Sequence, residues 1–163
     1  MHRIFELVGI GVFGGYAILV TGRLIGVVET AMNGWVLGCA AIIGYCLADL
    51  ISGLVHWFAD TYFGEDTPFV GPNFVGPFRF HHVDPKDITK HDFVEVNGNN
   101  CIVSFWVLMW AYHGRSVAAG DNADVFVLGL ALFSMLGIFA TTQFHKWAHA
   151  DTVPKSVAWL QRR

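Results

Sequence analysis

The sequence contains little charge. Lysine, arginine, aspartate and glutamate make up 14% of its 163 residues, whereas soluble domains contain about 25%. Hydrophobic residues account for 54%, and the mean hydropathy is +0.48. This composition excludes an ordinary soluble domain and predicts an all-α integral membrane protein, because helices satisfy their own backbone hydrogen bonds inside a bilayer. The length predicts a single membrane domain over residues 1–163.

The sequence is also short of cysteine and of net charge. Cys39, Cys46 and Cys101 are far apart and form no C-x-x-C pair. This spacing argues against a disulfide framework and against a thiolate zinc site, and it favours small buried side chains. The formal net charge of −3 argues against a nucleic-acid partner, since such partners are bound through an excess of lysine and arginine.

Four apolar runs predict four transmembrane helices. The third run is the weakest, because only its first twelve residues are uniformly apolar, and a re-entrant segment is its alternative. The first run is glycine-rich and is interpreted as a retained helix with close helix packing, followed by a polar break over residues 21–34. The runs cover residues 4–20, 35–57, 101–119 and 125–144.

Possible metal ligands gather at the ends of the second and fourth runs. His56 and Asp60 are four residues apart, and His145 and His149 repeat this spacing. On a helix the spacing places both side chains on one face, where they can bind the same ion. Taken separately, the polarity of a helix end explains each pair about as well as a metal does.

A polar segment between the second and third runs carries three more histidines, His81, His82 and His91. Its glycines and prolines interrupt a continuous helix, so we expect a His-rich loop over residues 62–100. If all four runs span, this loop and both termini share the side that holds most lysines and arginines, which the positive-inside rule makes cytoplasmic. Six of the eight histidines then meet at one membrane face, and a shared metal site explains that convergence best.

Several other polar residues have predicted roles around this site. Asp49 is either an acceptor that orients an imidazole or a helix-packing group. Asp92, Glu95 and Asn97 are expected to cap turns and to hydrogen-bond ligands. The remaining histidines, His2 and His113, are expected to be surface groups.

The number of ligands favours iron over zinc. A structural zinc ion takes four ligands and usually includes thiolates, and a catalytic zinc ion takes three protein ligands and water. Six histidines with at least one carboxylate exceed this and suit two iron ions with O2 as co-substrate. The alternative is a non-catalytic membrane protein that binds or moves a divalent metal. Haem ligation is a poorer hypothesis, because the histidines lie at helix ends.

Three motifs resemble those of the Kua-type lipid desaturases, a family that includes plasmanylethanolamine desaturases and plastid desaturases acting on phosphatidylglycerol. The resemblance extends over about residues 48–161. The motifs are A-D-x-x-S-G-x-x-H-W-x-x-D at 48–60, R-F-H-H-x-x-P-x-x-x-T-x-H-D-F-x-E-x-N-G-x-N-C at 79–101, and Q-F-H-K-W-A-H at 143–149.

This resemblance implies an O2-dependent, di-iron, multi-pass oxidoreductase that removes two hydrogens from a lipid-linked chain. It implies a phospholipid substrate, with the vinyl ether of plasmalogens as product in the ether-lipid members, and a cytochrome b5-like or ferredoxin-like electron donor. By position in the motifs, the implied iron ligands are His56, His81, His82, His91, His145 and His149, with Asp60 as a ligand or close support.

One family feature is missing from this sequence. The family continues after the last helix into an H-x-x-H-H cluster, and no such cluster follows residues 154–161 here. Six of the eight expected histidine ligands are therefore present, and we expect the chain to be a fragment that is incomplete at its C-terminus. The absence of a leader rich in arginine and serine favours a bacterial inner membrane or the endoplasmic reticulum over a plastid.

Overall fold

The computed structural model describes residues 2–68 and 70–162, and within these ranges the chain forms helices and turns and no strand. Met1 and Arg163, the two ends of the expected domain, and Phe69 lie outside the described residues. The all-α class predicted from the sequence is confirmed. The elements are α1 (His2–Val27), α2 (Ala31–Tyr62), a π-helix η1 (Gly71–Val75), α3 (Gly76–Val83), a 3-10 helix η2 (Asp87–Thr89), α4 (Phe93–His113), α5 (Asn122–His149) and α6 (Lys155–Gln161).

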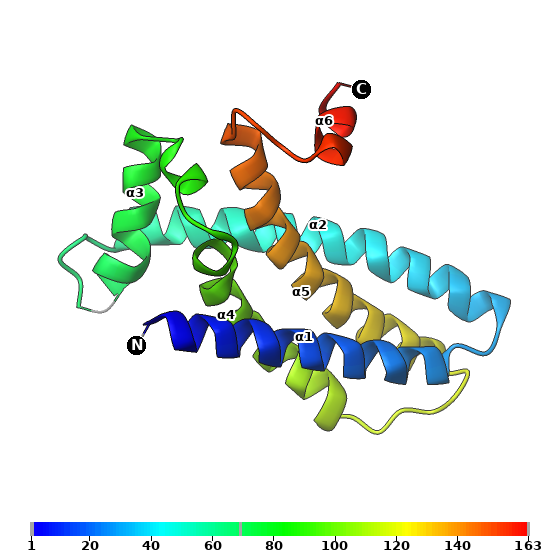
Figure 1. The fold of residues 1–163 in the computed structure, drawn as a ribbon. Helices are drawn as coiled ribbons and strands as arrows, with labels where there is room; N and C mark the ends of the chain where they lie inside the picture. The colour runs from blue at the N-terminus through cyan, green and yellow to red at the C-terminus, as the bar shows by residue number, and fades with distance from the viewer. Residues whose placement is uncertain (1, 69, 163) are drawn as a thin grey trace.

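The four long helices pack as two pairs. Helix α1 lies mainly along α4, α2 lies mainly along α5, and α4 and α5 join the two pairs. Figure 1 shows that consecutive long helices run in opposite directions, so that α2 and α5 end, and α4 begins, near α3. We call this the histidine end (residues 56–63, 76–95 and 143–149) and the opposite one the capped end (residues 23–33 and 111–124).

The apolar core lies between α1, α4 and α5. Val20, Leu108, Val125 and Leu128 are fully buried there. Helix α2 contributes little to this core and leaves many large apolar side chains exposed, among them Trp35 at 77%. Such a surface suits a helix that faces lipid, because lipid tails are as apolar as the side chains themselves.

Among the described residues, three helices are long and apolar enough to cross a membrane: Arg3–Val27, Ala31–Tyr62 and Asn122–His149. They correspond to the first, second and fourth predicted runs. Helix α4 is not among them, because its first two turns contain Glu95, Asn97 and further asparagines.

The predicted polar break over residues 21–34 is wrong for most of its length. Helix α1 continues to Val27, because the Thr21 hydroxyl donates to the Ala17 carbonyl at 2.7 Å and Arg23 reaches carbonyls of α4. Helix α2 then begins after Thr30, whose side chain accepts a hydrogen bond from the backbone of Asn33 in a capping box.

The predicted loop over residues 62–100 is also partly wrong. Pro72 and Pro77 each lie in the first turn of a helix, where proline is tolerated because that N–H has no helical partner. They therefore start helices, and His81 and His82 occupy the last turn of α3. Helix α4 begins at Phe93, eight residues before the third apolar run, after a capping box formed by Asp92 and Glu95.

Small residues allow α2 and α5 to approach closely. A Cβ atom at Gly44 would lie 2.9 Å from Phe133, and one at Gly137 would lie 2.7 Å from the Cβ of Ala48. In α1, by contrast, only Gly9 among the first four glycines meets a neighbouring helix, so the close packing expected of that glycine-rich run is limited to one position.

The expectation that all three cysteines are buried is wrong. Cys101 is buried, but Cys39 and Cys46 are exposed on α2. The reason is that α2 packs mainly against α5 and presents its remaining faces outward.

Candidate metal centre

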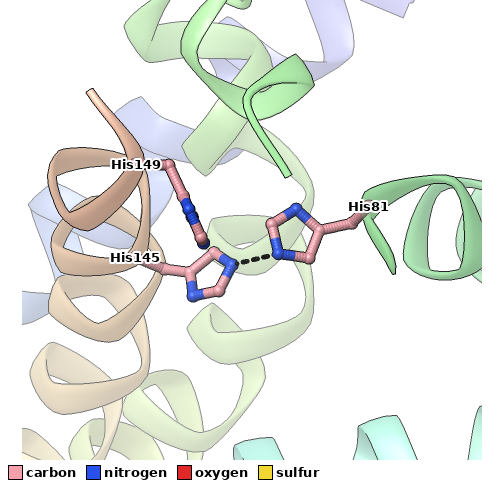
Figure 2. A group of neighbouring side chains, drawn as sticks. All are labelled: His81, His145 and His149. Atoms are coloured by element: carbon pink, nitrogen blue, oxygen red, sulfur yellow. Dashed lines mark hydrogen bonds between the residues drawn. The ribbon is translucent and has the colours of Figure 1, made fainter. Parts of the chain in front are cut away.

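Three histidines meet at the histidine end. His81 from α3 faces His145 and His149 from the last two turns of α5 (Figure 2). One nitrogen from each ring lies within 4.8 Å of the other two, and the Nε2 atoms of His81 and His145 are 2.9 Å apart. The four-residue spacing places His145 and His149 on one face of α5, as the sequence predicts.

Helix α3 brings His81 across to α5 because it is tied to the end of α2. The Arg79 guanidinium donates to the Phe63 carbonyl at 2.9 Å and to the Asp60 carbonyl at 3.4 Å. These are among the last carbonyls of α2, which have no partner within the helix and are commonly satisfied by basic side chains.

A second group of polar side chains lies beside the first. The Nε2 atom of His82 is 3.6 Å from Oδ2 of Asp60. His56, one turn before Asp60, stacks on Phe78 with ring centroids 3.9 Å apart and is close enough to His81 and His145 for their charges to interact. The rings of His81 and His82 are 6.2 Å apart and connect the two groups.

The surroundings of His81 favour its neutral form. Burial lowers the pKa of His81, and the charges of His149, His82 and His56 would repel a proton and lower this pKa further. A neutral imidazole keeps a nitrogen lone pair for a metal ion.

His91 lies apart from these two groups. Its Nδ1 is 3.3 Å from Oε2 of Glu95, and its Nε2 is 3.3 Å from Oδ2 of Asp87. Its carbonyl accepts a hydrogen bond from Lys146 of α5. In this arrangement both ring nitrogens of His91 face carboxylates.

The other predicted supporting residues have separate places. Asp92 and Glu95 form the capping box of α4, and Asp92 pairs with Arg3 at 2.6 Å. Asn97 is buried and donates to Gln143 of α5 at 3.2 Å. Asp49 is exposed on α2 and has no hydrogen-bond or ion-pair partner within residues 2–68 and 70–162.

Three residues that contact this region are not identified by the sequence reasoning. Asp87 bonds His91, and its four-residue spacing from His91 could have indicated the contact. Phe78 stacks on His56, and Gln143 bonds Asn97. Neither contact leaves a local signal in the sequence, since each depends on how distant helices pack.

The first group fits a metal ion, because it alone among the described residues brings three donor atoms within 4.8 Å of one another, and the second group adds donors beside it. The buried Oδ1 atom of Asp60 has no hydrogen-bond partner among the described residues, although such atoms are usually paired. Neutral imidazoles and a carboxylate are ligands that iron-class ions accept. Together the two groups offer six donors, more than one tetrahedral zinc ion uses.

Comparison with known proteins finds relatives with a shared chemistry. Residues 45–163 match the model of the lipid desaturase domain. The chain is 44% identical over 128 residues to a plasmanylethanolamine desaturase of Myxococcus xanthus, covering 78% of this chain and 44% of the relative. It is 44% identical over 111 residues to plasmanylethanolamine desaturase 1 of Mus musculus, covering 66% of this chain and 41% of the relative. It is 36% identical over 124 residues to the chloroplastic fatty acid desaturase 4 of Arabidopsis thaliana, covering 75% of this chain and 36% of the relative.

The chain thus spans less than half the length of these curated relatives. No solved structure matches it. The domain match covers most of the chain and includes the residues of both groups, from His56 to His149. The family expected from the three motifs is confirmed, and the chain belongs to the lipid desaturase domain family.

Proposed function

We propose that the protein is a membrane lipid desaturase that uses O2 to remove two hydrogens from a lipid-linked alkyl or acyl chain. Conversion of plasmanyl to plasmenyl lipids, which forms a vinyl ether, is the favoured reaction, because the two relatives at 44% identity carry that name. The convergence of His81, His145 and His149 within 4.8 Å is the observation that carries the proposal.

In this proposal two iron ions are held by the two groups described above. His81, His145 and His149 bind one ion, and His56, Asp60 and His82 bind the other. Bound iron supplies the redox chemistry that activates O2. His91 is proposed as a ligand from its motif position; this role requires its Nε2 to turn away from Asp87 while Glu95 orients the ring, as carboxylates do for many metal-bound imidazoles. Asp92 and Asn97 act at one remove, by capping α4 and by bonding it to Gln143 of α5, whereas Asp49 makes no hydrogen bond or ion pair with these ligands among the described residues.

The residues around the histidines have two further roles in the reaction. Phe78 covers one face of His56 and keeps water from that side of the site. Arg79 holds α3 against α2, which fixes His81 and His82 relative to His56. Such positioning matters because a reacting chain must stay within about 3–3.5 Å of the group that attacks it.

We further propose four spans, with α4 as the third, so that the whole domain lies in one membrane. The histidine end then faces the cytoplasm, because basic residues such as Arg79, Lys86 and Lys90 gather there. A bacterial inner membrane or the endoplasmic reticulum suits this orientation. Electrons come from a cytochrome b5-like or ferredoxin-like donor that approaches from the aqueous side.

The test is the metal content of the detergent-purified chain, followed by desaturation assays on ether and acyl phospholipids. About two iron ions per chain, one for each group of three donors, together with product formation, are expected. Iron near zero in a folded protein would contradict the ligand assignment, and bound iron without any desaturated product would contradict the activity.

A second candidate function is the binding or movement of a divalent metal without oxidation. It is favoured by one observation: three converging imidazoles suffice for one ion and leave open positions from which that ion can exchange. This function predicts one reversibly exchanging ion per chain and no consumption of O2 when a reductant and lipid are supplied.

A further inference from the structure

An apolar groove runs along α2 at the histidine end. Its volume is about 460 Å³, and every residue that lines it is apolar. One wall is a single face of α2 that contains Ile51, Leu54, Val55 and Phe58, at the spacing that aligns side chains along a helix. The opposite wall comes from the segment after α2 and from α3, including Phe78.

The outer side of this groove is open where α2 is suited to face lipid. Leu54, Val55 and Phe58 are each about half exposed, at 50%, 49% and 50%, and they lie on a helix that is long and apolar enough to cross a membrane. At such a position the surrounding medium is hydrocarbon, so an acyl or alkyl chain can enter sideways without crossing water.

The inner side of the groove reaches the candidate metal centre. Phe78 lines the groove and also stacks on His56. Ala59, another lining residue, directly precedes Asp60. The groove therefore extends from the lipid-facing surface of α2 to Phe78, the ring that separates it from His56.

We propose that this groove binds one hydrocarbon chain of a membrane phospholipid and leads it to His56 and Asp60. The proposal deepens the proposed function and rests on it, since it places the chain to be desaturated. The opening between α2 and α3 gives the chain a direction of entry, from the bilayer and not from the cytoplasm.

A second cavity serves as an internal control. It lies between α1, α2 and α5, has a volume of about 470 Å³, and is lined by apolar residues such as Ile25 and Leu136 together with Thr21. It has nearly the same size and also lies on membrane-suited helices, but none of its lining residues lies at the histidine end, whereas Phe78 of the groove stacks on His56. A lipid that merely fills apolar hollows would occupy both.

The experiment is photo-crosslinking in lipid nanodiscs that contain the full 163-residue chain. A trace of phospholipid with a diazirine on its hydrocarbon chain is the probe, and peptide mass spectrometry locates the crosslinks. We expect labelling of Leu54, Val55 and Phe58 in excess of labelling at Ile25 and Leu136. Unlabelled ether phospholipid is expected to compete only for the groove.

Filling the groove gives a second, independent readout. Val55→Trp is expected to remove the excess labelling, whereas Ile25→Trp in the control cavity is expected to leave it unchanged. Equal labelling of both cavities, or excess labelling that survives both Val55→Trp and Leu54→Trp, would overturn the proposal.

The outcome can be separated from that of the proposed function, because crosslinking requires neither metal nor turnover. Iron content and desaturation are measured on the same samples. Selective labelling without iron would support the groove and contradict the desaturase assignment. Bound iron and product without selective labelling would support the desaturase assignment and contradict the groove.

Discussion

The two ends of the helix bundle differ in how far their polar side chains are paired by hydrogen bonds within the chain. At the capped end, the Asn33 side chain makes four hydrogen bonds, and Arg23 donates to carbonyls at the end of α4. At the histidine end, three imidazoles face one another, and Oδ1 of Asp60 has no partner among the described residues. The capped end pairs most of its polar groups within the chain, with the Nε atom of Arg115 as an exception, and the histidine end assembles donors suited to a ligand.

This difference suggests that stability and function are assigned to opposite ends. Groups that pair with each other lower the free energy of the folded state, whereas converging donors of one kind do not. Substitutions at the capped end should therefore change unfolding and leave metal binding intact, and substitutions of the converging donors at the histidine end should do the opposite. Four predictions test this division.

The largest effect is expected for His145→Ala. This change removes one of the three converging imidazoles, and its effect on metal affinity should exceed the roughly 10–100-fold loss that follows removal of an outer-sphere partner. Iron per chain and desaturated product should both fall, with the unfolding temperature of the metal-free protein unchanged. His113→Ala is the matched control, since His113 lies at the capped end and bonds Tyr16. If the His145→Ala variant kept the iron content and product yield of the unaltered protein, metal binding would not depend on the histidine end.

Arg23→Ala should have the largest effect at the capped end. Arg23 donates to the carbonyls of Ala111 and Tyr112 and lies over the Tyr112 ring. Losing these charged hydrogen bonds should lower the free energy of unfolding by about 1.5–3 kcal/mol. Thermal unfolding in detergent measures this, and iron content should not change.

A second arginine on the same helix provides the control for that measurement. Arg3→Ala removes a half-exposed ion pair with Asp92 at the other end, and exposed pairs contribute only about 0–1 kcal/mol. If Arg23→Ala lowers the free energy of unfolding no more than Arg3→Ala does, the hydrogen bonds of Arg23 at the capped end do not stabilise the bundle as proposed.

Thr30→Ala should have a smaller effect at the same end. It removes the side chain that accepts from the Asn33 backbone at 3.1 Å and begins α2. Loss of such an N-cap costs about 1 kcal/mol. Thr30→Ser keeps the hydroxyl and should restore most of the stability. Equal unfolding temperatures for the alanine and serine variants would count against this cap.

The smallest effect is expected from acid at the start of α4. Hydrogen bonds from the Glu95 backbone N–H, from Arg3 and from the Val94 backbone N–H lower the pKa of Asp92. Because the folded-state pKa is the lower one, this stabilisation is present above the ordinary pKa of aspartate and is lost as the pH falls through the lowered value. Amide hydrogen exchange in the first turn of α4 should therefore accelerate in acid, and Asp92→Asn should remove that pH dependence.

Much of the fold follows from local patterns in the sequence. The first, second and fourth apolar runs predict helices that the structure contains, and the spacing of His145 and His149 predicts their shared face. What could not be predicted depends on contacts between distant segments. The start of α4 looks like a polar loop, but Asn97 and Asn100 bond Gln143 and Thr142 of α5, which makes polar residues stable inside a helical interface.

The candidate site shows the same limit. The motifs place six histidines at one end, and the structure brings His81 to His145 and His149 because Arg79 docks α3 on α2. It also places His91 between Asp87 and Glu95. The four-residue spacings of Asp87 and Glu95 from His91 are a local signal, but no local signal shows that His81 meets α5. Only the packing of α3 places it there.

The small-residue contact between α2 and α5 also affects the relative positions of histidines that lie far from it. Gly44 and Gly137 determine how the two helices are aligned along their length, and His56 and His145 lie further along those same helices. A slip by one helical turn would shift the two histidines by about 5.4 Å. A methyl group added at Gly137, in the middle of the bundle, would thus change the alignment of His56 and His145 at its end, although both histidines remain in the sequence.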